Sequence, residues 1–413
     1  MKVFRLKEYS VSGENSLSRC EAERLSAYLR KKKLQNVVSL TPQGIVSKSF
    51  VGVIRCGNVQ IEILPKIDHT FGVHSEGRRE IMENLVYMLS YTRRLDIRTE
   101  SGARLAACKN PFLEILIYEY ASSLFDCLKK QPLRNYVTEE TEVNFIKGKL
   151  MLPEQIRKSC VNRAKFYCQY DEFSENNMLN RLFLYVAVCL YKLSENSGNK
   201  RILRRIVNYY ADVEPLPVSA AEANRIALPR NQILFKKPLS LAKMFVNQCS
   251  VDLSRNKIEN VALVWDMNVL FEEFIGEVFK RKCPTLDIEL QKGKRLLSEA
   301  GTGRKKCDTF VDIFEKNNKI VIDTKYKEFH SLKDVSNADV FQVMTYCMLH
   351  GAKRAILIYP QYGDVAPDVP VHRLNAASED LGYAVQFKTV DLRRNLKKAR
   401  IERELLEVVE NLS

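Results

Sequence analysis

Histidine is scarce in this sequence, and paired cysteine motifs are missing. Its 413 residues include five histidines and 11 cysteines, and no two cysteines stand at C-x-x-C spacing. No histidine lies near a cysteine at the spacing that zinc ligands require. The sequence therefore argues against a structural zinc site. An odd number of scattered cysteines indicates reduced, buried thiols in a cytoplasmic protein.

Long apolar runs, a signal peptide and a nucleotide-binding loop are also missing. The longest run, LFLYVAVCLY at 182–191, is shorter than the roughly 20 residues that a membrane-spanning helix needs. The N-terminal MKVFRLKEYSVSG lacks the apolar centre of a signal peptide. GTGRKK at 301–306 lacks the G-x-x-x-x-G-K-[ST] spacing of a P-loop. We expect a cytoplasmic protein without a membrane segment, and any nucleotide must bind mainly to a partner.

Basic residues outnumber acidic ones. The chain has 65 Lys and Arg against 50 Asp and Glu, which gives a net charge of +15. This excess favours a polyanionic partner such as nucleic acid, although it also serves solubility. A hydrophobic content of 46% indicates a globular protein, and the length suffices for two or three domains.

The sequence divides into three consecutive regions that differ in the spacing of their apolar residues. Residues 1–78 are rich in alternating strand patterns and predict a small β-rich domain. Residues 79–254 are mainly helical, with a candidate β-hairpin at 135–156. Its acidic residues are interpreted as a solvated strand edge: Glu139, Glu140 and Glu142. Residues 255–413 alternate between helix and strand patterns. The predicted fold class is therefore multidomain, combining α/β and α+β parts.

Two acids and a lysine form the candidate site, in CDTFVDIFEKNNKIVIDTKYKEF at 307–329. Asp323 and Lys325 are two apart on a strand, so they project to the same face. Asp312 lies on the preceding strand, and adjacent strands are about 4.8 Å apart. Asp312 and Asp323 are thus candidate ligands of Mg²⁺, or of Mn²⁺, beside a lysine that stabilises negative charge. Asp308 is an alternative first ligand, less favoured because it lies farther from the turn.

Two amphipathic helices are predicted beside these strands. In WDMNVLFEEFIGEVFKR at 265–281, Glu272 lies at the edge of the apolar stripe. It either reaches the site or is an ordinary boundary glutamate. Gln342 and Tyr346 are four apart and share one helix face. The basic segment 292–306 is predicted to be a loop where a DNA backbone approaches, or simply a solvated loop.

This order of elements is similar to that of the PD-(D/E)xK nuclease superfamily. The resemblance implies a restriction-endonuclease-like α/β domain at 255–413. Gln342 and Tyr346 resemble the Q-x-x-x-Y motif of its exonuclease-like branch. The superfamily usually has proline before the first acid, and Val311 stands there in this chain.

A larger part of the chain resembles the McrC family, the nuclease subunits of modified-cytosine-specific restriction systems. Five stretches match that family's patterns in order: FVGVIRCGNVQIEILPKI, FIKGKLMLPEQI, DEFSENNMLNRLF, WDMNVLFEEFIGEVF and IVIDTKYKEF. The resemblance implies a Mg²⁺-dependent endonuclease subunit of a type IV restriction system, acting on double-stranded DNA with modified cytosine. It also implies a ring-forming AAA+ GTPase partner of the McrB type, whose GTP hydrolysis the N-terminal half of this chain stimulates.

Two other functions remain open at this point. A stand-alone repair-type nuclease acting at DNA ends is compatible with the Gln342 and Tyr346 pair. A non-catalytic adaptor that only activates an AAA+ ring fits the long helical region. The intact Asp323 and Lys325 pair argues against the adaptor.

Overall fold

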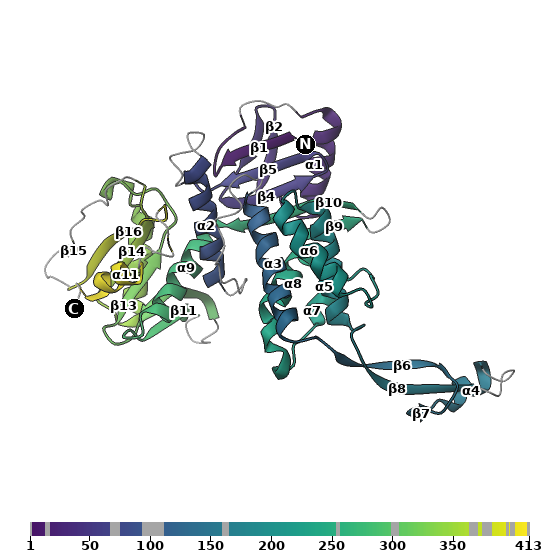
Figure 1. The fold of residues 1–413 in the computed structure, drawn as a ribbon. Helices are drawn as coiled ribbons and strands as arrows, with labels where there is room; N and C mark the ends of the chain where they lie inside the picture. The colour runs from purple at the N-terminus through teal and green to yellow at the C-terminus, as the bar shows by residue number, and fades with distance from the viewer. Residues whose placement is uncertain are drawn as a thin grey trace. The chain divides into compact units, whose positions relative to one another are not determined.

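The computed structural model divides into two compact units. It describes residues 2–12, 17–66, 75–92, 111–158, 165–252, 257–298, 305–362, 371–373, 382–393, 396 and 401–410. Unit 1 comprises Met1–Leu113 and Ala262–Ser413, whereas unit 2 comprises Glu114–Val261. The chain therefore begins in unit 1, forms unit 2, and returns to complete unit 1 (Figure 1).

The first part of unit 1 is a small sheet covered by a helix. Its strands β1 (Lys2–Lys7), β5 (Val59–Leu64) and β4 (Phe50–Cys56) lie side by side, and β10 (Lys257–Asp266) follows β4 in the sheet. Strand β1 runs parallel to β5, while β4 and β5 form an antiparallel hairpin. Gly52 has φ +131°, and a Cβ there would lie 2.0 Å from the Leu263 carbonyl oxygen. Only glycine permits this approach of β10.

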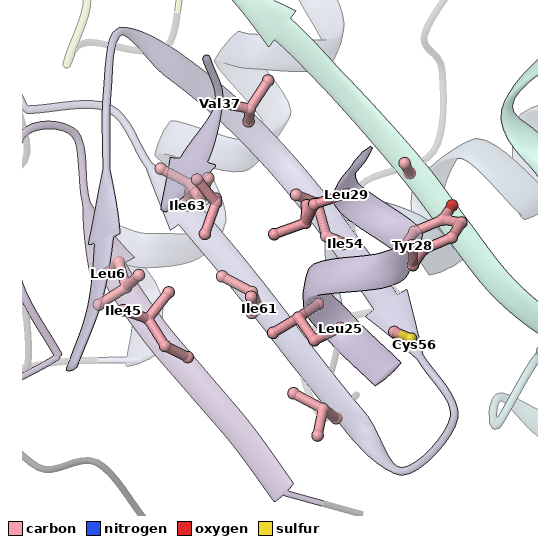
Figure 2. Close-up of a cluster of buried hydrophobic side chains, with 13 residues drawn as sticks. Leu6, Leu25, Tyr28, Leu29, Val37, Ile45, Ile54, Cys56, Ile61 and Ile63 are labelled. Carbon is pink, nitrogen blue, oxygen red and sulfur yellow. The ribbon is translucent and has the colours of Figure 1, made fainter. Parts of the chain in front are cut away.

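Helix α1 (Arg19–Lys31) forms the core of this part with the sheet. Ser18 and Glu21 form a capping box at its N-terminus. Its buried face contributes Leu25 and Leu29, which pack with Ile54 and Ile61 of the sheet (Figure 2). The hairpin of β2 (Val38–Thr41) and β3 (Gly44–Ser47) adds further apolar residues to the cluster. Alternation along the strands and helical spacing in α1 thus meet in one core.

The second part of unit 1 is built on a six-stranded mixed sheet. In spatial order its strands are β11 (Ile288–Ser298), β12 (Lys305–Glu315), β13 (Ile320–Thr324), β14 (Arg354–Pro360), β16 (Ala384–Val390) and β15 (His372–Arg373). Neighbours from β11 to β13 are antiparallel, whereas β13, β14 and β16 are parallel. Strand β13 is buried along its whole length, which explains its continuous apolar run.

Helices α9 (Met267–Lys282) and α10 (Asn337–His350) pack on this sheet. Val343 and Cys347 of α10 join Val321 and Leu357 in one apolar cluster. Gly276 of α9 approaches Leu290 and Ile313 of β11 and β12. The helix predicted within 265–281 and the helix predicted to carry Gln342 and Tyr346 are therefore confirmed as α9 and α10. Within its described residues the unit also contains α2 (Ser75–Tyr91), η3 (Leu332–Asp334) and α11 (Ile401–Glu410).

Unit 2 is mainly helical. Its helices are α3 (Pro111–Lys130, from Glu114 onward), α5 (Met178–Leu193), α6 (Ser197–Tyr209), α7 (Ala220–Arg225), η1 (Arg230–Phe235) and α8 (Lys236–Gln248), followed by β9 (Cys249–Asp252). Tyr120, Phe183 and Phe235 are completely buried in its core. The apolar run 182–191 lies in α5, where most of its side chains are buried. Within the described ranges, every helix is too short or too polar to span a membrane.

A β-arm extends from the helices of unit 2 (Figure 1). It contains β6 (Asn135–Val143), β8 (Phe166–Ser174), β7 (Lys149–Leu150) and the short helix α4 (Leu152–Lys158). A hairpin within 135–156 was predicted, but β6 pairs with β8 instead. The pairing partner lies beyond the segment that the local pattern marked. The three glutamates of β6 are exposed, as predicted.

The prediction of a basic loop at 292–306 is wrong for most of its length. Residues up to 298 belong to β11, and those from 305 belong to β12. Lys294 pairs with Thr309 and Arg295 with Asp308 in this antiparallel ladder. Lys294, Arg295 and Leu296 of β11 are exposed, and this stretch lacks the apolar alternation that reveals a half-buried strand. Arg304 and the side chains of Lys305 and Lys306 lie outside the described residues.

Candidate active site

Two adjacent strands bring Asp312 and Asp323 together. Ile313 pairs with Ile322 in the antiparallel ladder of β12 and β13, and the next position in that register sets Asp312 opposite Asp323. Oδ2 of Asp312 accepts hydrogen bonds from the main-chain nitrogen of Thr324 at 3.0 Å and from its hydroxyl at 3.1 Å. The Asp312 carboxylate is therefore fixed to the residue that follows Asp323.

Asp308 occupies a different place on β12. It pairs with Arg295 of β11, and β13 ends at Thr324, before the register reaches a position opposite Asp308. The ladder thus places Asp312, and not Asp308, beside Asp323. This geometry agrees with the sequence-based preference for Asp312, which rested on its nearness to the turn.

Lys325 links the end of β13 to helix α10. Its Nζ lies 2.7 Å from Oδ2 of Asp323 and donates a hydrogen bond to Oε1 of Gln342 at 3.0 Å. Nε2 of Gln342 in turn donates to the hydroxyl of Tyr346 at 2.6 Å. The Asp323 side chain is 1% exposed and that of Lys325 16%. The predicted Gln342 and Tyr346 pair therefore holds the lysine in a shielded place.

Glu272 faces the same region from helix α9. It lines a pocket of about 170 Å³ together with Asp312, Gln291 and four further residues: Glu273, Gly276, Glu277 and Leu290. Nε2 of Gln291 donates a hydrogen bond to Oε1 of Glu272. Of the two interpretations of Glu272 left open by the sequence, this position agrees with the one that reaches the site.

The three carboxyl groups influence each other's ionisation. Burial and then Asp312 raise the pKa of Asp323 to about 7. Burial, followed by Asp312 and Asp323, raises the pKa of Glu272 to about 7. Burial also raises the pKa of Asp312. Crowded carboxylates with raised pKa values mark a site that a nearby positive charge would stabilise.

Lys325 supplies one positive charge at this site. Burial alone lowers the pKa of its ammonium group, but Asp323 and Asp312 outweigh this effect and leave the pKa above its ordinary value. The lysine therefore stays protonated at neutral pH. A permanent cation of this kind stabilises negative charge and does not act as a general base.

The carboxylate set fits a divalent cation that has few protein ligands. Among the described residues, no group of three or more His, Cys, Asp and Glu side chains is arranged to hold a metal ion. Mg²⁺ commonly takes only one or two carboxylates and keeps its other positions for water and phosphate. Asp312 and Asp323 meet that requirement, and their mutual crowding matches the need for a cation.

Gln291 is a site residue that the sequence did not reveal. It lies on β11 with φ +52°, a left-handed conformation that is rare for a residue with a side chain. Its side chain bonds Glu272, and its hydrogen bond to Asp312 offsets part of the rise that burial causes in the pKa of that carboxyl group. A backbone outlier at a cluster of polar groups is a common feature of functional sites. No local pattern marks a glutamine in a polar stretch as part of a site.

Comparisons with known proteins agree with this architecture. The family model described as "McrBC 5-methylcytosine restriction system component" matches residues 45–360. A chain of the half-complex refined from a tetradecameric assembly of Thermococcus gammatolerans McrB AAA+ hexamers with bound McrC has a similar structure. It is 21% identical, with a TM-score of 0.71 over 96% of this chain and 99% of that chain.

A second solved structure is similar over a smaller range. A chain of the Thermococcus gammatolerans McrBC complex, solved by cryo-EM, is 23% identical, with a TM-score of 0.51 over 68% of this chain and 88% of that chain. No curated protein matches this sequence. At these identities the two structures establish a shared mixed α/β fold. The family model covers well over half of the sequence, and the chain therefore belongs to the family of McrBC 5-methylcytosine restriction system components.

Proposed function

We propose that this chain is the DNA-cutting subunit of a McrBC-type restriction complex. It would act with a ring-forming AAA+ GTPase of the McrB type on double-stranded DNA that contains modified cytosine. The observation that carries the proposal is the arrangement of Asp312, Asp323 and Lys325 on neighbouring strands. Family membership supports the restriction system, and the similar chains support the AAA+ partner. The second part of unit 1 would then be a PD-(D/E)xK nuclease domain.

Each polar residue has a distinct part in phosphodiester hydrolysis. Asp312 and Asp323 would hold Mg²⁺, or Mn²⁺ in its place. When bound, this ion supplies a Lewis acid for the phosphate and lowers the pKa of a water molecule. Lys325 stabilises the negative charge that develops on the phosphate oxygens. Gln342 and Tyr346 orient the lysine through their hydrogen-bonded chain, while Glu272 provides a further carboxyl group at the pocket.

The hairpin of β11 and β12 offers a path for the DNA backbone. Lys294 and Arg295 are exposed on β11, on the same hairpin that carries Asp312. Lysine and arginine side chains bind phosphates without regard to sequence, and this binding weakens as salt rises. The hairpin would hold the backbone near the carboxylates, while recognition of the modified base belongs to the partner.

The β-arm of unit 2 is the surface that we assign to the partner. It exposes large apolar side chains in an otherwise polar setting: Tyr136, Phe145, Ile146, Leu152, Ile156 and Phe173. Contiguous exposed apolar residues mark protein–protein interaction sites. The arm would present these residues to the AAA+ partner.

The decisive experiment uses the chain purified with its McrB-type partner. Methylated and unmethylated DNA are incubated with GTP or ATP, and with Mg²⁺, Mn²⁺, Ca²⁺ or excess chelator. We expect cutting of methylated DNA with GTP and Mg²⁺ or Mn²⁺. Little cutting is expected with Ca²⁺, because its looser coordination positions water poorly. Undiminished cutting in chelator would contradict the proposed metal chemistry.

Three variants test the residue assignments in the same assay. Asp323→Ala and Asp312→Ala should each reduce cutting by about 100-fold or more, because a metal ligand is lost. Both should still stimulate GTP hydrolysis. Asp308→Ala, on the same strand as Asp312, is the matched control and should keep most of the cutting activity. Loss of cutting in Asp308→Ala alone would show that Asp308 is the first ligand.

The two other functions predict different results. A stand-alone repair nuclease would cut DNA ends without the partner or GTP. A non-catalytic adaptor would stimulate GTP hydrolysis without any cutting, and Asp323→Ala would change nothing.

A further inference from the structure

Tyr326 joins the candidate site to the N-terminal strands β1 to β5 within unit 1. It directly follows Lys325, and its hydroxyl donates a hydrogen bond to Oε2 of Glu8 at 2.9 Å. The main-chain nitrogen of Lys66 donates to the same oxygen at 3.0 Å. Glu8 immediately follows β1, and both Glu8 and Tyr326 are buried. The residue after the candidate catalytic lysine is therefore fixed to the end of an N-terminal strand.

The ammonium group of Lys66 places a positive charge beside this contact. Its ammonium nitrogen lies 5.1 Å from the ring centroid of Tyr326, and 5.7 Å from those of Tyr9 and Tyr362. Attraction between a cation and ring faces stabilises such a cluster, more so when it is shielded from water. Three tyrosines and one lysine thus hold N-terminal and C-terminal segments of unit 1 together.

The carboxyl group at the centre of the cluster is incompletely satisfied. Burial raises the pKa of Glu8 to about 7. Its second oxygen, Oε1, is buried and has no hydrogen bond within the described residues. A buried polar atom without a partner reduces the stability of the contact.

A second contact ties the same strands to the other side of the site. The main-chain nitrogen of Met267, at the start of α9, donates to the carbonyl oxygen of Ser49 at 2.9 Å. Phe271 of α9 packs its ring 5.9 Å from that of Tyr326, and Glu272 is the next residue. The N-terminal part of unit 1 thus contacts two of the segments that carry site residues, α9 and the chain after β13.

We propose that Tyr326 is a positioning residue whose hydrogen bond to Glu8 fixes the main chain at Lys325, so that the nuclease site depends on the arrangement of the N-terminal strands. This inference rests on the proposed nuclease function. On one side Lys325 is held by its main-chain nitrogen, which donates to the Ile358 carbonyl oxygen at 2.9 Å. On the other side its carbonyl oxygen accepts a hydrogen bond from the main-chain nitrogen of Lys327 at 2.9 Å, and the Tyr326 side chain anchors the residue between them to Glu8. Loss of the Tyr326 bond removes this anchor, so that the main chain at Lys325 can shift relative to Asp323.

The test compares Tyr326→Phe, Glu8→Leu and the double variant in the full chain with its partner. Each single variant should lower kcat for DNA cutting roughly tenfold with an unchanged KM, because small displacements of a catalytic group reduce the rate strongly. The double variant should be no slower than the slower single variant within about twofold, because both remove one interaction. Glu8→Gln keeps an acceptor for the Tyr326 hydroxyl and should retain most of the rate.

Tyr120→Phe is the matched control. Tyr120 is a buried tyrosine of unit 2 whose hydroxyl donates to the Phe183 carbonyl oxygen at 2.8 Å. Tyr120→Phe removes one buried hydrogen bond, as Tyr326→Phe does, but should leave kcat unchanged. An equal fall of kcat in Tyr120→Phe and Tyr326→Phe would overturn the positioning role in favour of general stability.

Amide hydrogen exchange gives a readout that does not depend on cutting. Tyr326→Phe and Glu8→Leu should increase exchange at the Lys325 amide several-fold, whereas Tyr120→Phe should not. Unchanged exchange at Lys325 together with unchanged kcat would overturn the inference. If the wild-type complex cuts no DNA, the proposed function fails, and the exchange measurement still decides whether Tyr326 fixes the chain at Lys325.

Discussion

At the scale of single residues, buried charges depend on their neighbours. Asp323 is nearly inaccessible, yet it stands beside Lys325 at 2.7 Å. Removing one member of such a pair leaves the other buried and uncompensated. Glu8 is a different case. The hydroxyl of Tyr326 and the main-chain nitrogen of Lys66 donate hydrogen bonds to its Oε2. Its Oε1 has no hydrogen bond among the described residues.

Glu8 makes a testable contribution to the pH dependence of stability. Burial raises its pKa from 4.5 to about 7, so the folded protein retains a proton that the unfolded chain releases between these values. The wild-type free energy of unfolding should therefore fall as pH rises from about 5 to 8. Glu8→Gln removes this dependence. Between pH 5 and pH 8 the free energy of unfolding of the variant should therefore rise by roughly 2–3 kcal/mol relative to that of the wild type, since one pKa unit corresponds to about 1.36 kcal/mol.

Urea unfolding at pH 5 and pH 8 measures this difference. A stability difference between Glu8→Gln and the wild type that is the same at both pH values would contradict the proposed burial of an ionisable Glu8. A stability advantage of Glu8→Gln that is larger at pH 5 than at pH 8 would mean that the pKa of Glu8 is lowered and not raised in the folded protein.

At the scale of elements, the β-arm and the strands of unit 1 show opposite distributions of apolar side chains. Strand β13 buries every residue, whereas the arm exposes Phe145 at 68% and Ile156 at 72%. Gly148 has φ +68°, and a Cβ there would lie 2.4 Å from the Gln169 carbonyl oxygen. The glycine therefore lets the chain turn close against β8 beside these exposed residues.

The arm prediction concerns partner binding. The triple variant Phe145→Ser, Ile146→Ser and Ile156→Ser should weaken stimulation of the partner's GTP hydrolysis by about tenfold or more, because central apolar contacts dominate interface energies. Its thermal unfolding should match the wild type, because these side chains are largely exposed. Ile233→Ser alters an apolar residue of unit 2 that is 63% exposed outside the arm, and serves as the control. Full stimulation by the triple variant would remove the arm from the interface.

At the scale of the whole molecule, unit 1 is assembled from both ends of the chain. Strand β10 brings Leu263 against Gly52 of β4, and the main-chain nitrogen of Met267 bonds the Ser49 carbonyl oxygen. The stability of a shortened protein should therefore depend on whether it keeps both the N-terminal and the C-terminal segments of unit 1.

Two shortened proteins test this assembly. A chain that ends at residue 250 loses all of β10, the strand that lies against β4, and its N-terminal part should be destabilised. A loss of about 3 kcal/mol would lower Tm by on the order of 10 °C. A protein in which a flexible linker replaces Glu114–Val261 keeps all of unit 1 and should unfold cooperatively. Melting followed by circular dichroism measures Tm for both proteins. Equal Tm values for the two would contradict the assembly of unit 1 from both ends of the chain.

The extent of sequence-based prediction varied from feature to feature. The helices with Glu272 and with Gln342 follow from strong apolar periodicity, which is a local property. The pairing of β6 with β8 was missed because β8 lies beyond the segment that the local pattern marked. The strands at the basic segment were missed because their exposed residues carry no apolar alternation. Gln291 was missed because its part in the site depends on a backbone conformation and on two neighbours distant in sequence.

The sequence by itself determined the candidate residues Asp312, Asp323 and Lys325, and the family to which the chain is similar. These depend on residue types at short spacing, which local chemistry governs. Only the tertiary structure decided that Asp312 rather than Asp308 lies opposite Asp323, because strand register is set by packing across the sheet. It also decided that Tyr326 meets Glu8 and that both ends of the chain form unit 1. Contacts between residues hundreds of positions apart arise from burial of shared apolar surface, and no local pattern encodes them.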